Sequence, residues 1–477
     1  MSQPSLLRAA TPLFIGRGLS AVLTFCIPIV LARAMAQSEY GTYKQFFLLA
    51  GSLYLVGQMG LAGSLYYFLP RHSGEERGRW LLQALTGLFV IGGFAAAGTL
   101  IFTGALAARW DNPQLAGLAL PLALYIWAYL GAAPLEIALT ACKRTGWAAA
   151  CYVLSDLVRT AALIGPILLG RGVVTLAWAA AGFALLRLTA AWLLAFSGAL
   201  GRPLPPTRAA IKAQLAYCLP FAGAVVLATA QLQMPQFVVA GLTDAATYAV
   251  FAVGVLQIPL ADMVYTPIAE IMMVRLAQTD ARHAPAVFRE AVARLCMFFL
   301  PLCAFVLAVG PALIPTLYTA VYVASVPIFI IAMLEMPLSA LPVDGLLRSF
   351  GATRTIMRIG FLRLVMAAVL VPLGFFLLGL PGTMLGYVAT QWTAKTLLLF
   401  AASRTLHVPV RSLLPSGELR AWTVRSVFLF GAVTLLRLQG PWHGYGFLIA
   451  ASLTALLIWV VSLLSAGESL RWREVHV

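Results

Sequence analysis

The chain has 477 residues, of which 61% are hydrophobic and only 10% are charged, and its formal net charge is +16. Soluble domains carry roughly 25% charged residues, so this composition excludes a soluble globular protein. The basic residues are spread over many short segments between apolar stretches. That distribution argues against a nucleic-acid-binding face and predicts anionic membrane lipids as partners.

Fourteen apolar segments follow one another along the chain, and all but the short thirteenth reach the ~20 residues that a transmembrane helix needs. In chain order the predicted spans are 11–32, 45–68, 80–102, 113–140, 146–169, 173–200, 215–241, 246–274, 291–317, 323–347, 356–378, 382–402, 424–436 and 445–464. The fold class that this pattern predicts is an all-α polytopic membrane protein with about 14 transmembrane helices.

The charge pattern predicts an orientation. If the N-terminus is cytoplasmic, most of the 32 Lys and Arg residues fall in cytoplasmic ends and loops, and few fall in the opposite loops. Lys and Arg near span ends resist translocation. Because the number of predicted spans is even, both termini are expected in the cytoplasm.

An internal repeat relates the two halves of the sequence. Residues 34–43 before the second span resemble residues 240–248 before the eighth. The other matches are Pro12 with Pro220, Pro28 with Pro235, and Arg144-Thr145 with Arg354-Thr355. All lie about 205 to 210 residues apart, so the repeated unit is six spans, and both copies have the same orientation.

The repeat predicts two parallel lobes around a central cavity. We expect an N-terminal lobe over 1–200, a Pro-rich cytoplasmic linker over 201–213, and a C-terminal lobe over 214–403. A basic, amphipathic segment over 404–423 is expected on the cytoplasmic surface, followed over 424–477 by the last two spans and a cytoplasmic tail.

Several cations lie inside predicted spans, where ionisable groups usually face the bundle interior. They are Arg17, Arg159, Arg187, Arg363 and Lys395. Cations outnumber acids there, and arginine matches phosphate oxygens with two hydrogen bonds, so we predict that these residues bind an anionic substrate. Other interpretations stay open: Arg17 and Arg363 fit headgroup anchors, and Arg159 fits a local ion pair with Asp156.

The acids inside predicted spans have two interpretations, and so do the prolines. Asp156, Asp262 and Glu335 could couple transport to protons or sodium, and Asp262 or Glu335 could instead pair with Arg187 or Lys395. Pro337 and Pro342 are predicted to form a bending element, against ordinary helix curvature. The His and Cys spacing fits no metal site, and no cofactor is expected.

Short motifs in both halves resemble the polysaccharide flippases of the multidrug/oligosaccharidyl-lipid/polysaccharide exporter superfamily, in its Wzx-like branch. The resemblance rests on residues 31–34, 39–43, 60–61 and 66–71 in the first half, and on 345–354 and 382–387 in the second. It covers the whole length, with fourteen spans arranged as two six-span lobes plus two.

The resemblance implies a protein of the bacterial inner membrane that moves polyprenyl-diphosphate-linked oligosaccharide to the periplasmic leaflet for O-antigen, exopolysaccharide or capsule assembly. Polysaccharide polymerase and chain-length regulator proteins are implied as partners, and no enzymatic activity is expected. One alternative is a drug or small-molecule exporter of the same superfamily. Another is a membrane polysaccharide polymerase or ligase, although the short outer loops leave little room for a catalytic site.

Overall fold

The computed structural model describes residues 22–467, apart from residues 257, 259, 281 and 441. Within that part of the chain the secondary structure is helical and contains no β-strand, which confirms the predicted all-α fold. The chain divides into two compact units, Met1–Ala252 and Val253–Val477. The predicted division into lobes at 201–213 stays a prediction.

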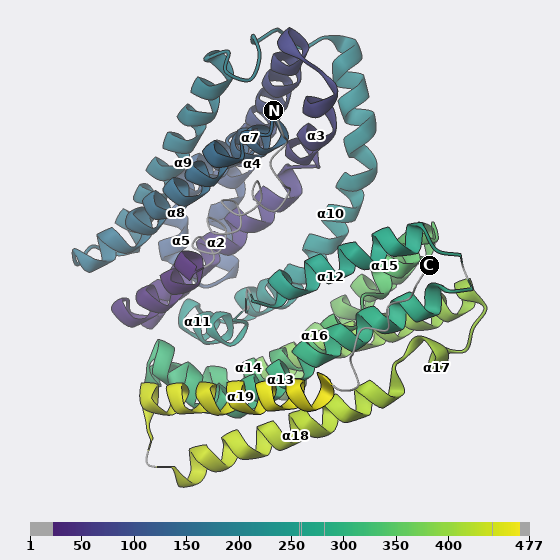
Figure 1. Ribbon diagram of the computed structural model, residues 1–477. Helices are drawn as coiled ribbons and strands as arrows, with labels where there is room; N and C mark the ends of the chain where they lie inside the picture. The colour runs from purple at the N-terminus through teal and green to yellow at the C-terminus, as the bar shows by residue number, and fades with distance from the viewer. Residues whose placement is uncertain (1–21, 257, 259, 281, 441, 468–477) are drawn as a thin grey trace. The chain divides into compact units, whose positions relative to one another are not determined.

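The first described helix of the first unit is Val22–Ala34. The helices that follow it are α2 (Gln37–Gly57), α3 (Leu61–Phe68), η1 (Leu69–Arg71), α4 (Gly74–Arg109), α5 (Pro113–Gly117), α6 (Ala119–Gly131), α7 (Pro134–Ala141), α8 (Thr145–Leu168), α9 (Val173–Phe196) and α10 (Arg208–Leu242). In this unit α6 packs between α4 and α9. Helix α8 packs on α9 (Figure 1).

The second unit contains helices that are more often interrupted. They are α11 (Ala245–Gly254), which begins in the first unit, then α12 (Leu260–Ala277), α13 (Ala284–Tyr318), η2 (Ala320–Ser325), α14 (Val326–Met333), η3 (Met336–Ala340), α15 (Val343–Ser349), α16 (Thr353–Leu406), α17 (Val410–Leu413), α18 (Ser416–Gln439) and α19 (Gly444–Gly467). The last two helices, α18 and α19, lie against α13 (Figure 1).

Many large apolar side chains point away from the helix packing. Phe94 on α4 is 75% exposed, and Phe376 on α16 is 72% exposed. So many exposed apolar side chains would be unfavourable in water, whereas the acyl chains of a lipid bilayer can surround them. By length and composition, ten of the described helices can cross a membrane, or eleven if the bent pair α2 and α3–η1 forms one span. The predicted total of fourteen stays a prediction.

Two predicted spans form one hairpin in α16, because the backbone at Gly379 leaves the helical region with φ 66°. The two arms approach closely at glycines, and a Cβ atom on Gly382 would clash with the carbonyl oxygen of Gly374. Only glycine allows backbones to approach this closely.

We therefore expect Gly382→Ala to destabilise the protein by about 1–3 kcal/mol, because the two arms must separate to make room. The measurement is thermal unfolding of the purified protein in detergent. Gly93→Ala in α4 is the matched control, since a Cβ there meets open space. Equal unfolding temperatures for the two variants would contradict the close contact.

The region between the twelfth and thirteenth predicted spans is largely helical in the structure. The thirteenth span, predicted over 424–436, is the middle of the longer helix α18, which begins at Ser416. Within the segment predicted to lie on the surface, Leu413 is 0% exposed and Trp422 is 3% exposed. These two side chains pack on the protein, and the location of the segment at the cytoplasmic surface stays a prediction.

The two copies of the repeated sequence before the second and eighth spans contact each other. Gln37 Nε2 donates a hydrogen bond of 3.1 Å to the carbonyl oxygen of Ala246. Gly41 lies against the backbone of Ala245, and a Cβ atom on Gly41 would clash with it. Residues more than 200 positions apart therefore meet at equivalent places in the two copies.

Candidate functional site

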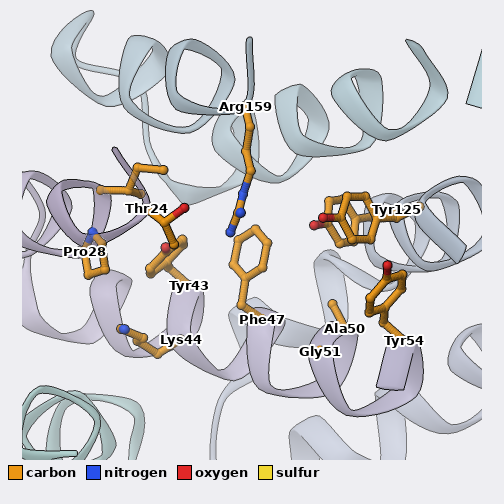
Figure 2. Close-up of a pocket in the computed structure, with 12 residues that line it drawn as sticks. Thr24, Pro28, Tyr43, Lys44, Phe47, Ala50, Gly51, Tyr54, Tyr125 and Arg159 are labelled. Carbon is orange, nitrogen blue, oxygen red and sulfur yellow. The ribbon is translucent and has the colours of Figure 1, made fainter. Parts of the chain in front are cut away.

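A cavity of about 340 Å³ lies within the first unit. Its walls come from four helices: Thr24, Ile27 and Pro28 from Val22–Ala34; Tyr43, Lys44, Phe47, Ala50, Gly51 and Tyr54 from α2; Tyr125 and Tyr129 from α6; and Arg159 from α8. Figure 2 shows these side chains around the cavity.

The α2 wall follows from helix geometry. Tyr43, Phe47 and Tyr54 recur at spacings that place them on one face of a helix. Gly51 on the same face has no side chain and leaves space, because a Cβ there meets nothing within 4 Å. The sequence of α2 thus forms a wall with aromatic sides and a gap.

The aromatic rings form a continuous surface from α2 to α6. The ring centroids of Phe47 and Tyr125 are 5.5 Å apart, and those of Tyr54 and Tyr129 are 4.9 Å apart. Tyr125 and Tyr129 stack with an interplanar angle of 12°. Tyrosine combines an apolar ring with a polar hydroxyl, so this wall can contact apolar surfaces and form hydrogen bonds.

Arg159 is the principal cation of the cavity. Figure 2 shows its side chain reaching from α8 toward Tyr43 and Phe47. One guanidinium nitrogen lies 3.9 Å from the carboxylate of Asp156, at the outer limit of an ion pair. Its Nε is buried and has no hydrogen-bond partner among the described residues. The guanidinium therefore retains capacity to bind an oxyanion.

A second cation lies next to the aromatic wall. The Arg187 guanidinium on α9 lies 5.1 Å from the ring centroid of Tyr129. It also contacts both carboxylate oxygens of Glu136 on α7, each at 2.8 Å. The side chains of Arg187 and Glu136 are 11% and 5% exposed. This is a buried ion pair with two parallel contacts, and the Ser155 hydroxyl adds a hydrogen bond of 3.4 Å to Glu136.

The second unit contains a related group of charges. Lys395 on α16 contacts the Asp344 carboxylate on α15 at 3.0 Å. Arg363 donates a hydrogen bond of 3.1 Å to the Gln391 side chain. Glu335 lies at the break between α14 and η3 and interacts electrostatically with Arg363 and Lys395.

The cations predicted from the sequence have different partners in the structure. Arg159 lines the cavity, and its predicted local pair with Asp156 is present at 3.9 Å. Arg187 and Lys395 were expected to be available in the cavity or paired with Asp262 or Glu335. Their partners are instead Glu136 and Asp344, two acids that the sequence placed near span ends. Their predicted role in substrate binding stays a prediction, as does that of Arg363.

Two of the predicted residues lie outside what the structure describes: Arg17, and the side chain of Asp262. The coupling role predicted for Asp156, Asp262 and Glu335 stays a prediction. The prolines are at helix breaks: Pro337 begins η3, and Pro342 is the N-cap of α15. That this broken segment bends during a transport cycle stays a prediction. Among the described residues, no group of three or more His, Cys, Asp and Glu side chains could hold a metal ion.

Sequence reasoning missed Lys44 and the four tyrosines of the cavity. Their signal was present, since Tyr125 and Tyr129 are four residues apart and face the same side of α6. The same spacing is typical of rings that only fill a helix interface, so the pattern alone could not identify a cavity.

Comparisons with known proteins agree with this description. The family model described as "Polysaccharide biosynthesis protein" matches residues 30–327. No sequence among the curated proteins matches the chain.

Three solved structures are similar in fold. Lipid II flippase MurJ in an inward closed conformation has a TM-score of 0.71 at 13% identity, covering 98% of this chain and 100% of that one. An inward-facing multidrug resistance MATE family transporter of the MOP superfamily has a TM-score of 0.64 at 14% identity, covering 84% and 98%. A MOP superfamily transporter from Pyrococcus furiosus has a TM-score of 0.57 at 16% identity, covering 84% and 95%. These similarities show the fold of a multi-pass membrane protein.

Proposed function

The chain belongs to the polysaccharide biosynthesis protein family, and on that premise we propose that it is a flippase for polyprenyl-diphosphate-linked oligosaccharide repeat units. It would move them across the bacterial inner membrane for assembly of a surface polysaccharide. The observation that supports this proposal best is the cavity of the first unit, where the buried Nε of Arg159 has no partner in the described part of the chain and the side chain faces a tyrosine wall.

The chemistry of the cavity fits such a substrate. A diphosphate that crosses hydrocarbon unaided loses its hydration at a large free-energy cost. A guanidinium inside the membrane lowers this cost because it binds phosphate oxygens directly. The tyrosine wall offers ring faces and hydroxyls to a sugar, and the polyprenyl chain can stay in lipid. Two repeated halves can then expose the substrate alternately to each side.

The remaining parts of the proposal follow from this role. The termini would be cytoplasmic, and a polysaccharide polymerase and a chain-length regulator would act on the transported product. Coupling to protons or sodium through Asp156, Asp262 or Glu335 is an open part of the same proposal. A drug exporter is a second candidate, since two of the similar structures are superfamily transporters and one of them is a multidrug transporter.

The deciding experiment compares a deletion strain with the same strain carrying the wild-type gene. We expect the deletion to remove surface polymer and to trap lipid-linked repeat units on the cytoplasmic side. Restoration by wild type, at a protein level checked by blotting, would support the flippase. Unchanged lipid-linked sugars and surface polymer together with altered drug sensitivity would replace it with the exporter.

Filling the cavity should also block transport. Gly51→Leu adds a side chain at a cavity wall where a Cβ has no steric conflict, so the fold should be kept while space for substrate is lost. We expect at least a tenfold lower rate of repeat-unit translocation in membrane vesicles. Gly93→Leu on α4 is the control, because its Cβ also meets open space but it does not line the cavity. Equal rates for both variants would mean that substrate does not pass through this cavity.

A further inference from the structure

Two ion pairs occupy equivalent positions in the internal repeat. Glu136 pairs with Arg187 in the first unit, and Asp344 pairs with Lys395 in the second. Within each pair the partners are 51 positions apart. Both partners of the second pair lie 208 positions after those of the first, as the residue numbers show, and this matches the spacing of the repeat.

The local structure around the two acids is also the same. Glu136 lies in the first turn of the short helix α7, which Pro134 begins. Asp344 lies in the first turn of the short helix α15, after Pro342 at its N-cap. In both units a proline therefore precedes the acid by two residues, and the acid lies in the first turn of a short helix.

The two cations come from equivalent helices as well. Arg187 is on α9, the last span of the first repeat, and Lys395 is on the second arm of α16, the last span of the second repeat. Each ion pair thus fastens the short helix that carries the acid to the last span of its own repeat. We call each such pair a clasp.

The two clasps differ in how firmly they are closed. Arg187 holds Glu136 through two contacts, and both side chains are almost fully buried. Lys395 holds Asp344 through one contact, and Asp344 is 34% exposed. A planar guanidinium holds a carboxylate in one geometry, whereas a lysine ammonium is a mobile point charge.

The surroundings of the second clasp supply alternative partners. Arg348 and Arg363 also act electrostatically on Asp344, and Glu335 interacts with Lys395. If this clasp opens, each charge can approach another charge of opposite sign. Opening the first clasp would leave a buried charge without an equal partner, which is unfavourable. The second clasp can therefore open at much lower cost.

We propose that these four residues are positioning residues: the clasp of the first unit stays closed, and the clasp of the second unit opens and closes in each transport cycle. This inference rests on the proposed function, because a transport cycle requires a transporter. The opening would release the broken span at Pro337 and Pro342, so that the segment η3–α15 changes its angle to α16 while the corresponding segment of the first unit stays in place.

The test fixes each clasp covalently in the full-length protein. In a variant in which the six native cysteines are replaced, and whose transport is first verified, two double substitutions are made: Glu136→Cys with Arg187→Cys, and Asp344→Cys with Lys395→Cys. A cleavable bifunctional thiol reagent then links each cysteine pair in vesicles. Translocation of lipid-linked oligosaccharide is measured before linking, after linking and after cleavage.

Opposite responses are expected. Linking the first pair replaces a clasp that should stay closed, so it should raise translocation at least threefold over the unlinked variant. Linking the second pair should lower translocation at least tenfold, and cleavage should restore it. Equal responses of the two pairs, in either direction, would overturn the proposal, because a merely structural role predicts that both links are tolerated or beneficial.

A second readout separates this inference from the proposed function. One spin label on α15 and one on the second arm of α16 report the distribution of distances between these two elements by pulsed electron paramagnetic resonance. The second link should narrow this distribution to one state, and the first link should leave it unchanged. If the wild type moves no lipid-linked oligosaccharide, the proposed function fails, and the spin-label distances alone decide about the clasps. If neither link alters this distribution of distances, the proposed roles of the two clasps are wrong.

Discussion

Arg159→Ala should lower the translocation of lipid-linked oligosaccharide by about 10- to 100-fold without unfolding the protein. A hydrogen bond to a charged group contributes about 1.5–3 kcal/mol, and each 1.4 kcal/mol corresponds to a factor of about ten. The Arg159 guanidinium lines the cavity and its Nε donates no hydrogen bond to the described residues, so on the proposed function its loss removes a contact to the diphosphate. The measurement is the initial rate in vesicles at limiting substrate.

Two controls make this prediction specific. Arg159→Lys keeps the charge but loses the planar pair of donors, so it should retain part of the rate. Arg171→Ala removes an arginine from the exposed loop before α9 and should leave the rate unchanged. If Arg159→Ala transports as fast as wild type at equal abundance, the cavity does not bind the diphosphate.

The fold was largely predictable because hydrophobicity along a membrane helix is a local property. The apolar runs over 146–169 and 173–200 correspond to α8 and α9, and their ends agree with those of the helices to within a few residues. Breaks inside spans were harder to predict. The span predicted over 113–140 is divided into α5, α6 and α7: the backbone leaves helical angles at Leu118, before α6, whereas Ala132 and Ala133, before α7, keep right-handed helical angles. Neighbouring spans can satisfy such interruptions, so an apolar run does not imply a continuous helix.

The site was predictable only where the partners are close in sequence. Asp156 and Arg159 share one face of α8 three residues apart, and the structure places them together. Glu136 and Arg187 are 51 positions apart, so their pairing depends on how α7 packs on α9. Hydropathy placed Glu136 near a span end and gave no reason to pair it. Knowledge of the repeat alone would relate the two clasps to each other, but it would not reveal that either one exists.

Glu136→Ala should destabilise the protein by about 3–5 kcal/mol, because it leaves the Arg187 guanidinium buried without its carboxylate. Thermal unfolding in detergent measures the loss. The double variant Glu136→Ala with Arg187→Leu should recover most of it, since it removes both charges. Asp344→Ala should cost clearly less, because Asp344 is 34% exposed and Lys395 can turn toward Glu335. If Glu136→Ala unfolds at the wild-type temperature, Arg187 does not depend on this partner, and the first clasp contributes nothing to the stability of its unit.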